Sequence, residues 1–154
     1  MTDQPDRFSE HAGPSMECDP HPPLPTPAQT PYAEPHWDAL QSERLLIQEC
    51  VDCGERQHFP RPWCRNCASE TLDWIESDGR AELYSYSVPR RPVEVVEYEP
   101  AVPYVVGLVD LDVGVRVVST VVNCDIGDVE IGMDLQAVYD HVTEDVTLVR
   151  FEPA

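Results

Sequence analysis

Four cysteines are the residues of this chain with the clearest capacity for chemistry. They form two Cys-x-x-Cys pairs separated by ten residues: Cys50, Cys53, Cys64 and Cys67. Each pair brings two thiolates within reach of one ion, and ten residues suffice for a hairpin that returns the second pair to the first. The spacing therefore predicts one tetrahedral zinc site. Because four thiolates leave no position for water, we expect a structural zinc and not a catalytic one.

The residues near these cysteines fit a ribbon. Gly54 follows the first pair, where a positive φ lets backbone N–H groups turn toward the sulfurs. His58 lies between the pairs, but we expect it not to bind the metal, since the thiolates already complete the shell. Cys18 and Cys124 stand apart from the four and are interpreted as isolated thiols.

The composition restricts the class of protein. The 154 residues carry a net charge of −19 and contain no lysine, so ten arginines supply the fixed positive charge. Such a chain is repelled by nucleic acid and by anionic membranes. The sequence has no apolar run of membrane-spanning length, and its first residues lack the basic start and apolar stretch of a signal peptide. We expect a cytoplasmic protein, where thiols stay reduced and bind metal.

Three segments follow from the pattern of breakers and apolar residues. Residues 1–35 contain nine of the sixteen prolines and are predicted to be a disordered acidic tail. An alternative is that the proline run is a polyproline II ligand for a partner. Residues 36–76 are predicted to form a short helix, over about 36–42, and the four-cysteine ribbon. Residues 77–154 alternate apolar and polar side chains.

This alternation predicts five strands in about 75 residues, which is typical of a small closed barrel. The expected strands are residues 80–89, 103–112, 115–122, 133–141 and 146–151. The turn Asp112-Val113-Gly114 makes the second and third strands a hairpin. The fold class is therefore mainly β.

Candidate binding residues lie in the ribbon and in one loop. Phe59 and Trp63 are expected to form the small apolar surface of the ribbon and, with Trp37, are candidates for a partner interface. Trp37 either anchors the helix on the ribbon or contacts a partner, as exposed tryptophans at interfaces do. Arg90 and Arg91 are the one adjacent basic pair, and they begin a long loop that is either an anion site or simply solvated. The sequence shows no catalytic carboxylate pair, Ser-His-Asp set or phosphate loop.

The order of these motifs resembles the zinc-ribbon/OB-fold proteins associated with acyl-CoA thiolases and related aldolases. The resemblance runs from about residue 35 to residue 153. Its motifs are His36-Trp37, Cys50 to Gly54, Phe59-Pro60, Trp74, Ser77-x-Gly79-Arg80, Pro103 to Val106, Val109 to Asp112, Ile131-Gly132-Met133 and Phe151-Glu152-Pro153. The chain departs from the pattern at Ala68, where glycine is usual, and at Arg61-Pro62, where the usual order is changed.

The resemblance implies a short helix with a rubredoxin-like zinc ribbon, followed by a five-stranded OB-fold barrel. It implies an accessory subunit without catalytic residues, beside a thiolase-fold, aldolase-type or acyl-CoA hydratase subunit, including those of steroid side-chain metabolism. The barrel would help to hold an acyl-CoA, whose phosphates need cations. The candidates for that role are Arg61, Arg80, Arg90 and Arg91.

Two other functions stay open. OB barrels and zinc ribbons also bind nucleic acid, and Tyr84 and Tyr86 could stack on bases. Against this, residues 78–154 hold fifteen acids and five arginines, so their charge opposes a phosphate backbone. A free-standing enzyme is the third possibility, and it lacks a visible catalytic constellation.

Overall fold

The computed structural model describes residues 26–91 and 102–154. The ribbon half contains η1 (Pro31–Ala33), α1 (Glu34–Gln41), β1 (Leu45–Cys50), β2 (Arg56–Gln57) and β3 (Leu72–Ser77). The barrel half contains β4 (Arg80–Ser87), β5 (Val105–Leu111), β6 (Arg116–Val121), η3 (Ile126–Asp128), β7 (Asp134–His141) and β8 (Thr147–Pro153). The prediction of a mainly β fold with one short helix is confirmed.

The ribbon is a three-stranded antiparallel sheet with β1 in the centre, in the order β2-β1-β3. Helix α1 begins two residues before the predicted start because Pro35 occupies its first turn, where a missing N–H costs nothing. Its buried side chains include Trp37 and Leu40, which pack in the same core as Leu45 and Ile47 of β1.

The barrel closes in the order β4-β5-β6-β8-β7, with β7 pairing back onto β4. The predicted hairpin is confirmed, since β5 and β6 pair antiparallel and the Leu111 N–H donates to the Val115 carbonyl. Gly79 lets β7 approach the start of β4: a Cβ at this residue would lie 2.6 Å from the Cβ of Ala137, and its φ is +78°. Every side chain larger than hydrogen is therefore excluded there.

The barrel is not paired equally all round. Strands β6 and β8 run parallel, and within the described residues their one register pair is Val121 with Phe151. Toward their N-terminal ends the two strands separate. Elsewhere each neighbouring pair is antiparallel, over at least three register positions.

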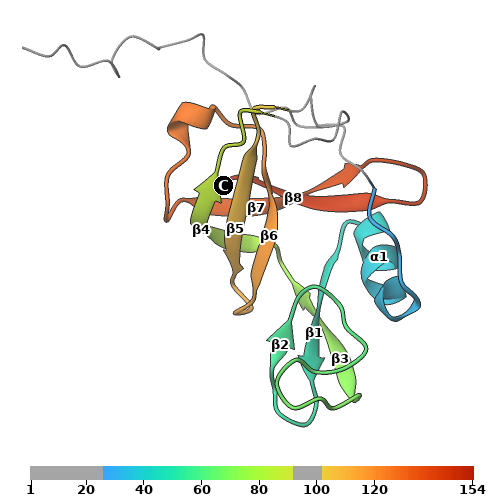
Figure 1. Ribbon diagram of the computed structural model, residues 1–154. Helices are drawn as coiled ribbons and strands as arrows, with labels where there is room; N and C mark the ends of the chain where they lie inside the picture. The colour runs from blue at the N-terminus through green and yellow to red at the C-terminus, as the bar shows by residue number, and fades with distance from the viewer. Residues whose placement is uncertain (1–25, 92–101) are drawn as a thin grey trace, which may run out of the picture.

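Of the predicted tail, residues 1–35, the structure describes the last ten, and these include η1 and the first turn of α1. Ala33 is fully buried, and the Gln29 side chain donates to the Asp145 carbonyl in the β7–β8 turn. Gln41, at the end of α1, donates to the neighbouring Glu144 carbonyl. Helix α1 therefore lies between the ribbon sheet and the projecting β7–β8 hairpin (Figure 1).

Two predictions fall outside the described residues. They concern the proline-rich segment 1–25, with Cys18, and most of the loop 90–101. None of the helices in the described part of the chain reaches the length and hydrophobicity that a membrane span requires.

Candidate metal centre and ribbon surface

The four ribbon cysteines meet at one point. Their Sγ atoms all lie within 4.8 Å of one another, and the described residues contain no other group of three or more ligand side chains this close. Both the Cys50–Cys67 and the Cys53–Cys64 Sγ distances are 3.6 Å. A tetrahedron with Zn–S bonds of about 2.3 Å has S–S edges of about 3.8 Å. The site therefore has the size of a tetrathiolate zinc centre.

The pKa values of these thiols also indicate that a cation is needed for all four to be ionised. The Glu55 N–H, and then the Asn66 amide, lower the pKa of Cys53 to about 7. At Cys67 the Ser69 N–H lowers the pKa, but the neighbouring thiols, Cys53 first, together with desolvation raise the pKa to about 12. Four thiolates this close repel one another, so they ionise together only around a positive ion. A divalent metal supplies that charge.

Two tight turns present the sulfurs. In the first, the Gly54 N–H donates to the Cys50 carbonyl at 2.8 Å, and Gly54 has the predicted positive φ, +73°. In the second, the Ala68 N–H donates to the Cys64 carbonyl at 3.0 Å, and Ala68 takes φ +60°. Alanine pays a steric cost in this left-handed region that glycine does not. The departure noted at Ala68 is thus a strained position and leaves the ligand geometry intact.

A pair of buried glutamines holds the second turn, and sequence analysis did not find it. Gln48 and Gln57 are register partners on β1 and β2, and the Gln57 side-chain amide donates to the side-chain oxygen Oε1 of Gln48 at 2.8 Å. Gln57 also donates to the Trp63 carbonyl and accepts from the Arg65 N–H. The Gln48 side chain in turn donates to the Arg61 carbonyl and accepts from the Arg61 N–H. The loop that carries Cys64 is therefore anchored by side chains.

The aromatic residues divide into an anchor and an exposed surface. Trp37 is 5% exposed and lies 5.8 Å from Phe59 between ring centroids, so here it acts as the anchor of α1. Phe59 and Trp63 expose 41% and 53% of their surface. Trp37 is therefore too buried for the partner contact that we considered for it, whereas Phe59 and Trp63 remain exposed.

His58 packs among these rings and not at the metal site. Its ring centroid lies 5.3 Å from that of His36 and 5.5 Å from that of Phe59. Its Nε2 atom is buried without a hydrogen-bond partner in the described structure. Burial, reinforced by His36, lowers the pKa of His58 to about 3, so the ring is neutral.

The candidate anion-binding arginines are not gathered into one site. Arg61 is exposed on the loop before the second cysteine pair. Arg80 begins β4 and pairs with Asp78 at 2.6 Å. Arg90 and Arg91 are exposed beyond the other end of β4, a strand about 25 Å long by its eight residues. At most one or two of these charges can therefore meet a given phosphate.

Comparison with known proteins agrees with both halves of the structure. Residues 37–73 match the family model described as ChsH2, rubredoxin-like zinc ribbon domain. Residues 74–140 match the model described as ChsH2, C-terminal OB-fold domain. The expected zinc ribbon, with one structural zinc, and the expected OB-fold barrel are thereby confirmed.

Individual relatives carry several names. A probable enoyl-CoA hydratase alpha subunit of Thermomonospora curvata is 36% identical over 120 residues, which cover 77% of this chain but 36% of that protein. The chain thus spans about a third of that relative's length. A DUF35 domain-containing scaffold protein of Methanothermobacter thermautotrophicus is 33% identical over 68% of this chain and 78% of its own length. A solved structure titled Ltp2-ChsH2(DUF35) aldolase is 34% identical, with a TM-score of 0.71, over 82% of this chain and 98% of that one.

Proposed function

Since this chain belongs to the ChsH2/DUF35 family of zinc-ribbon and OB-fold proteins, we propose that it is a non-catalytic subunit of an enzyme that acts on acyl-CoA. The observation that carries the proposal is the likeness, over nearly the whole length of the matched chain, to a structure titled as an aldolase. A scaffold relative supports an organising role, and a hydratase alpha subunit supports acyl-CoA as the substrate class of the complex. The partner is a thiolase-fold, aldolase-type or hydratase subunit that holds the catalytic residues.

Within this proposal Cys50, Cys53, Cys64 and Cys67 bind the zinc. Their mutual distances support a closed tetrahedral shell, and such a shell holds the fold and does not activate water. The ion replaces the hydrophobic core that so small a sheet cannot build. The zinc thereby fixes the loop on which Phe59 and Trp63 are exposed.

Phe59 and Trp63 form the contact to the partner enzyme. Large aromatic side chains that stay exposed on a rigid support are typical centres of protein interfaces. Both residues are held from behind, Phe59 by its ring contact with Trp37 and Trp63 by the hydrogen bond from Gln57 to its carbonyl. The ring contact limits the side-chain freedom of Phe59 and the hydrogen bond fixes the backbone of Trp63, so less freedom is lost on binding.

Contact with the CoA is the weaker part of the proposal. Arg61, Arg90 and Arg91 are exposed and have the charge that CoA phosphates need, whereas Arg80 is already paired with Asp78. A nucleic-acid function has less support, because Tyr84, one of the two candidate stacking residues, is covered by the Arg116 guanidinium at 3.3 Å and the barrel is acidic.

Affinity purification of the tagged chain from its source cells tests the proposal, with the acyl-CoA activity of the product assayed beside that of the isolated chain. We expect an enzyme subunit to copurify and the activity to reside in the complex. Trp63→Ala should release that subunit, while Tyr32→Ala, a similarly exposed aromatic on η1, should retain it. A chain that is active alone, or that copurifies with nucleic acid, would contradict the proposal.

A further inference from the structure

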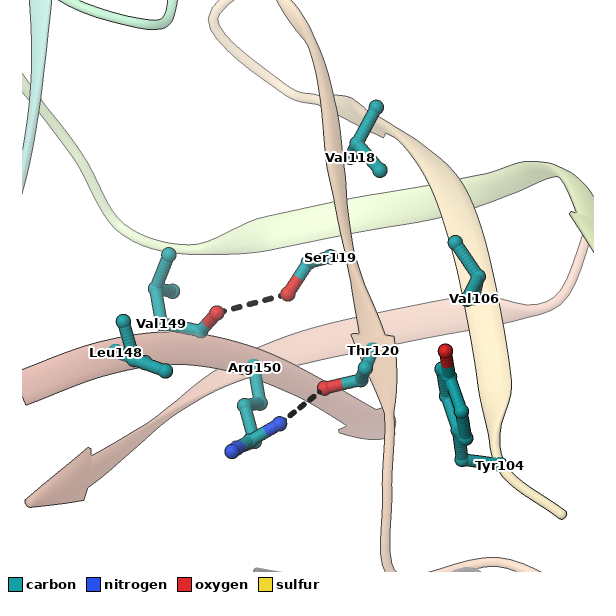
Figure 2. Close-up of a pocket in the computed structure, with 8 residues that line it drawn as sticks. All are labelled: Tyr104, Val106, Val118, Ser119, Thr120, Leu148, Val149 and Arg150. Carbon is teal, nitrogen blue, oxygen red and sulfur yellow. Dashed lines mark hydrogen bonds between the residues drawn. The ribbon is translucent and has the colours of Figure 1, made fainter. Parts of the chain in front are cut away.

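The separation of β6 and β8 leaves a groove of about 300 Å³ on the barrel wall. Figure 2 shows its lining, which comes from three strands and the residue before one of them. The lining residues are Tyr104, Val106, Val118, Ser119, Thr120, Leu148, Val149 and Arg150. The groove lies apart from the zinc centre and is not used by the function proposed above.

Backbone pairing between the two strands that border this groove is incomplete. The Ser119 hydroxyl donates to the Val149 carbonyl at 2.8 Å, a side-chain bridge where the other neighbouring strands of the barrel have backbone pairs (Figure 2). Within the described residues, register between the two strands is limited to Val121 and Phe151. Backbone groups of β6 before Thr120 are therefore left facing the groove, and an unpaired strand edge is a template for another extended chain.

The walls favour an apolar side chain as the occupant. Val106 and Leu148 are half-buried in the groove, while Val118 at its rim is 68% exposed, the most exposed large apolar side chain of the described barrel. An extended chain laid along β6 would cover Val118 and place alternate side chains against these walls.

The charges disfavour an anionic occupant. Arg150 in the groove is 3% exposed and is already paired with Asp140 at 2.6 Å and bonded to Thr120 at 2.6 Å. An incoming carboxylate or phosphate would have to compete with Asp140 for a buried guanidinium whose charge is already neutralised. Arg116, the other arginine of residues 102–154, is paired with Asp110, whereas this segment contains ten acids.

Exposed acids also lie on both sides of the groove residues along β8. Glu144 and Asp145 are exposed in the β7–β8 turn next to the start of β8, and Glu152 follows Arg150 by two residues on the same strand. The surface therefore attracts positive charge and repels nucleic acid, CoA phosphates and the acidic residues of this chain's own N-terminal segment.

We propose that the groove between β6 and β8 binds an extended basic segment of a partner protein, by strand addition along β6 and burial of its apolar side chains against Val106, Val118 and Leu148. The inference rests on the proposed function only in taking the partner to be a protein subunit. Backbone hydrogen bonds supply the affinity, and the alternation of apolar and basic side chains supplies the selectivity.

The probe is a seven-residue peptide of alternating valine and arginine with blocked ends, titrated into the ¹⁵N-labelled full-length zinc-loaded protein. Two peptides serve as controls: the same sequence with glutamate for arginine, and the arginine peptide with alternate backbone amides methylated, which cannot pair as a strand. Val118→Arg places a positive charge in the groove. Ile131→Arg adds the same charge at a residue equally exposed, 67%, in the turn before β7.

We expect saturable binding with amide shifts confined to β6, β8 and Tyr104, and no binding of either control peptide. Val118→Arg should weaken binding roughly tenfold or more by like-charge repulsion and loss of the apolar rim. Ile131→Arg should change it less than about twofold, because salt screens a distant charge. Shifts elsewhere, equal binding of the methylated peptide, or equal loss in both variants would overturn the inference.

The two proposals fail separately. If an enzyme subunit copurifies equally with native protein and with Val118→Arg, the groove is not its docking site and this inference is wrong, while the proposed function stands. If no subunit copurifies with the native protein, the proposed function is wrong, and the peptide titration still decides what the groove binds.

Discussion

Replacing Gln57 by alanine tests how the metal-bearing loop is held. Gln57 is 1% exposed, and its side-chain amide makes hydrogen bonds to Gln48, Trp63 and Arg65. The truncation removes the hydrogen bond to each of these three buried or half-buried groups, and each lost bond lowers the free energy of unfolding by about 1 kcal/mol or more. We therefore expect a loss of roughly 3 kcal/mol in the free energy of unfolding, which corresponds to a fall in Tm of about 10 °C for a chain of this size.

The loss should appear in two assays. Urea unfolding with zinc present should give the lower stability, and competition with a chromogenic chelator should show weaker zinc binding, because the Cys64 turn is no longer fixed. Gln136→Ala is the matched control, since that exposed amide has one hydrogen bond, to the Asp78 carbonyl, and should cost less than about 1 kcal/mol. Equal effects of the two substitutions would refute the view that the glutamine pair positions the ribbon loop.

Three further predictions concern the same half of the molecule. Cys64→Ser should abolish stoichiometric zinc and unfold the ribbon, because such a site contributes on the order of 10 kcal/mol; full zinc content by atomic absorption and an unchanged melting curve would contradict it. The pKa of His58 is about 3 in the folded protein and 6.5 ordinarily, so the unfolded chain takes up a proton first and stability falls as pH drops from 6.5 toward 3. Urea unfolding at a series of pH values between 6.5 and 4.5 should therefore show that the free energy of unfolding depends less steeply on pH in His58→Phe than in the native protein. Gly54→Ala should lower the free energy of unfolding by about 1 kcal/mol through backbone strain alone, since the new Cβ would meet nothing within 4 Å. Ala68→Gly should raise it by up to about 1 kcal/mol, because glycine adopts the same positive φ without strain. Thermal melts that show the opposite signs would count against both turn conformations.

Much of the fold could be predicted because its signals are local. The spacing of Cys50, Cys53, Cys64 and Cys67 defines the ribbon, and strict alternation with a glycine turn at Gly114 defines strands and a hairpin. These patterns depend on neighbours within about ten residues. The positive φ of Gly54 was predictable for the same reason, since the turn that requires it is adjacent in the sequence.

Other features depend on pairing between distant residues. Gln48 and Gln57 look like ordinary polar strand residues until the register of β1 and β2 places them together. Arg150 looks like a surface charge, yet Asp140 neutralises it in the barrel wall. Prolines indicate disorder by composition, whereas the burial of Ala33, at the end of the predicted tail, depends on contacts with residues distant in the sequence.

Native mass spectrometry of the tagged chain purified from its source cells tests the central claim most directly. We predict one species that contains this chain with one zinc ion per copy, bound to an acyl-CoA enzyme subunit of the thiolase, aldolase or hydratase type, and the loss of that subunit in Trp63→Ala. Recovery of the zinc-loaded chain alone, or in association with nucleic acid, would contradict an accessory subunit.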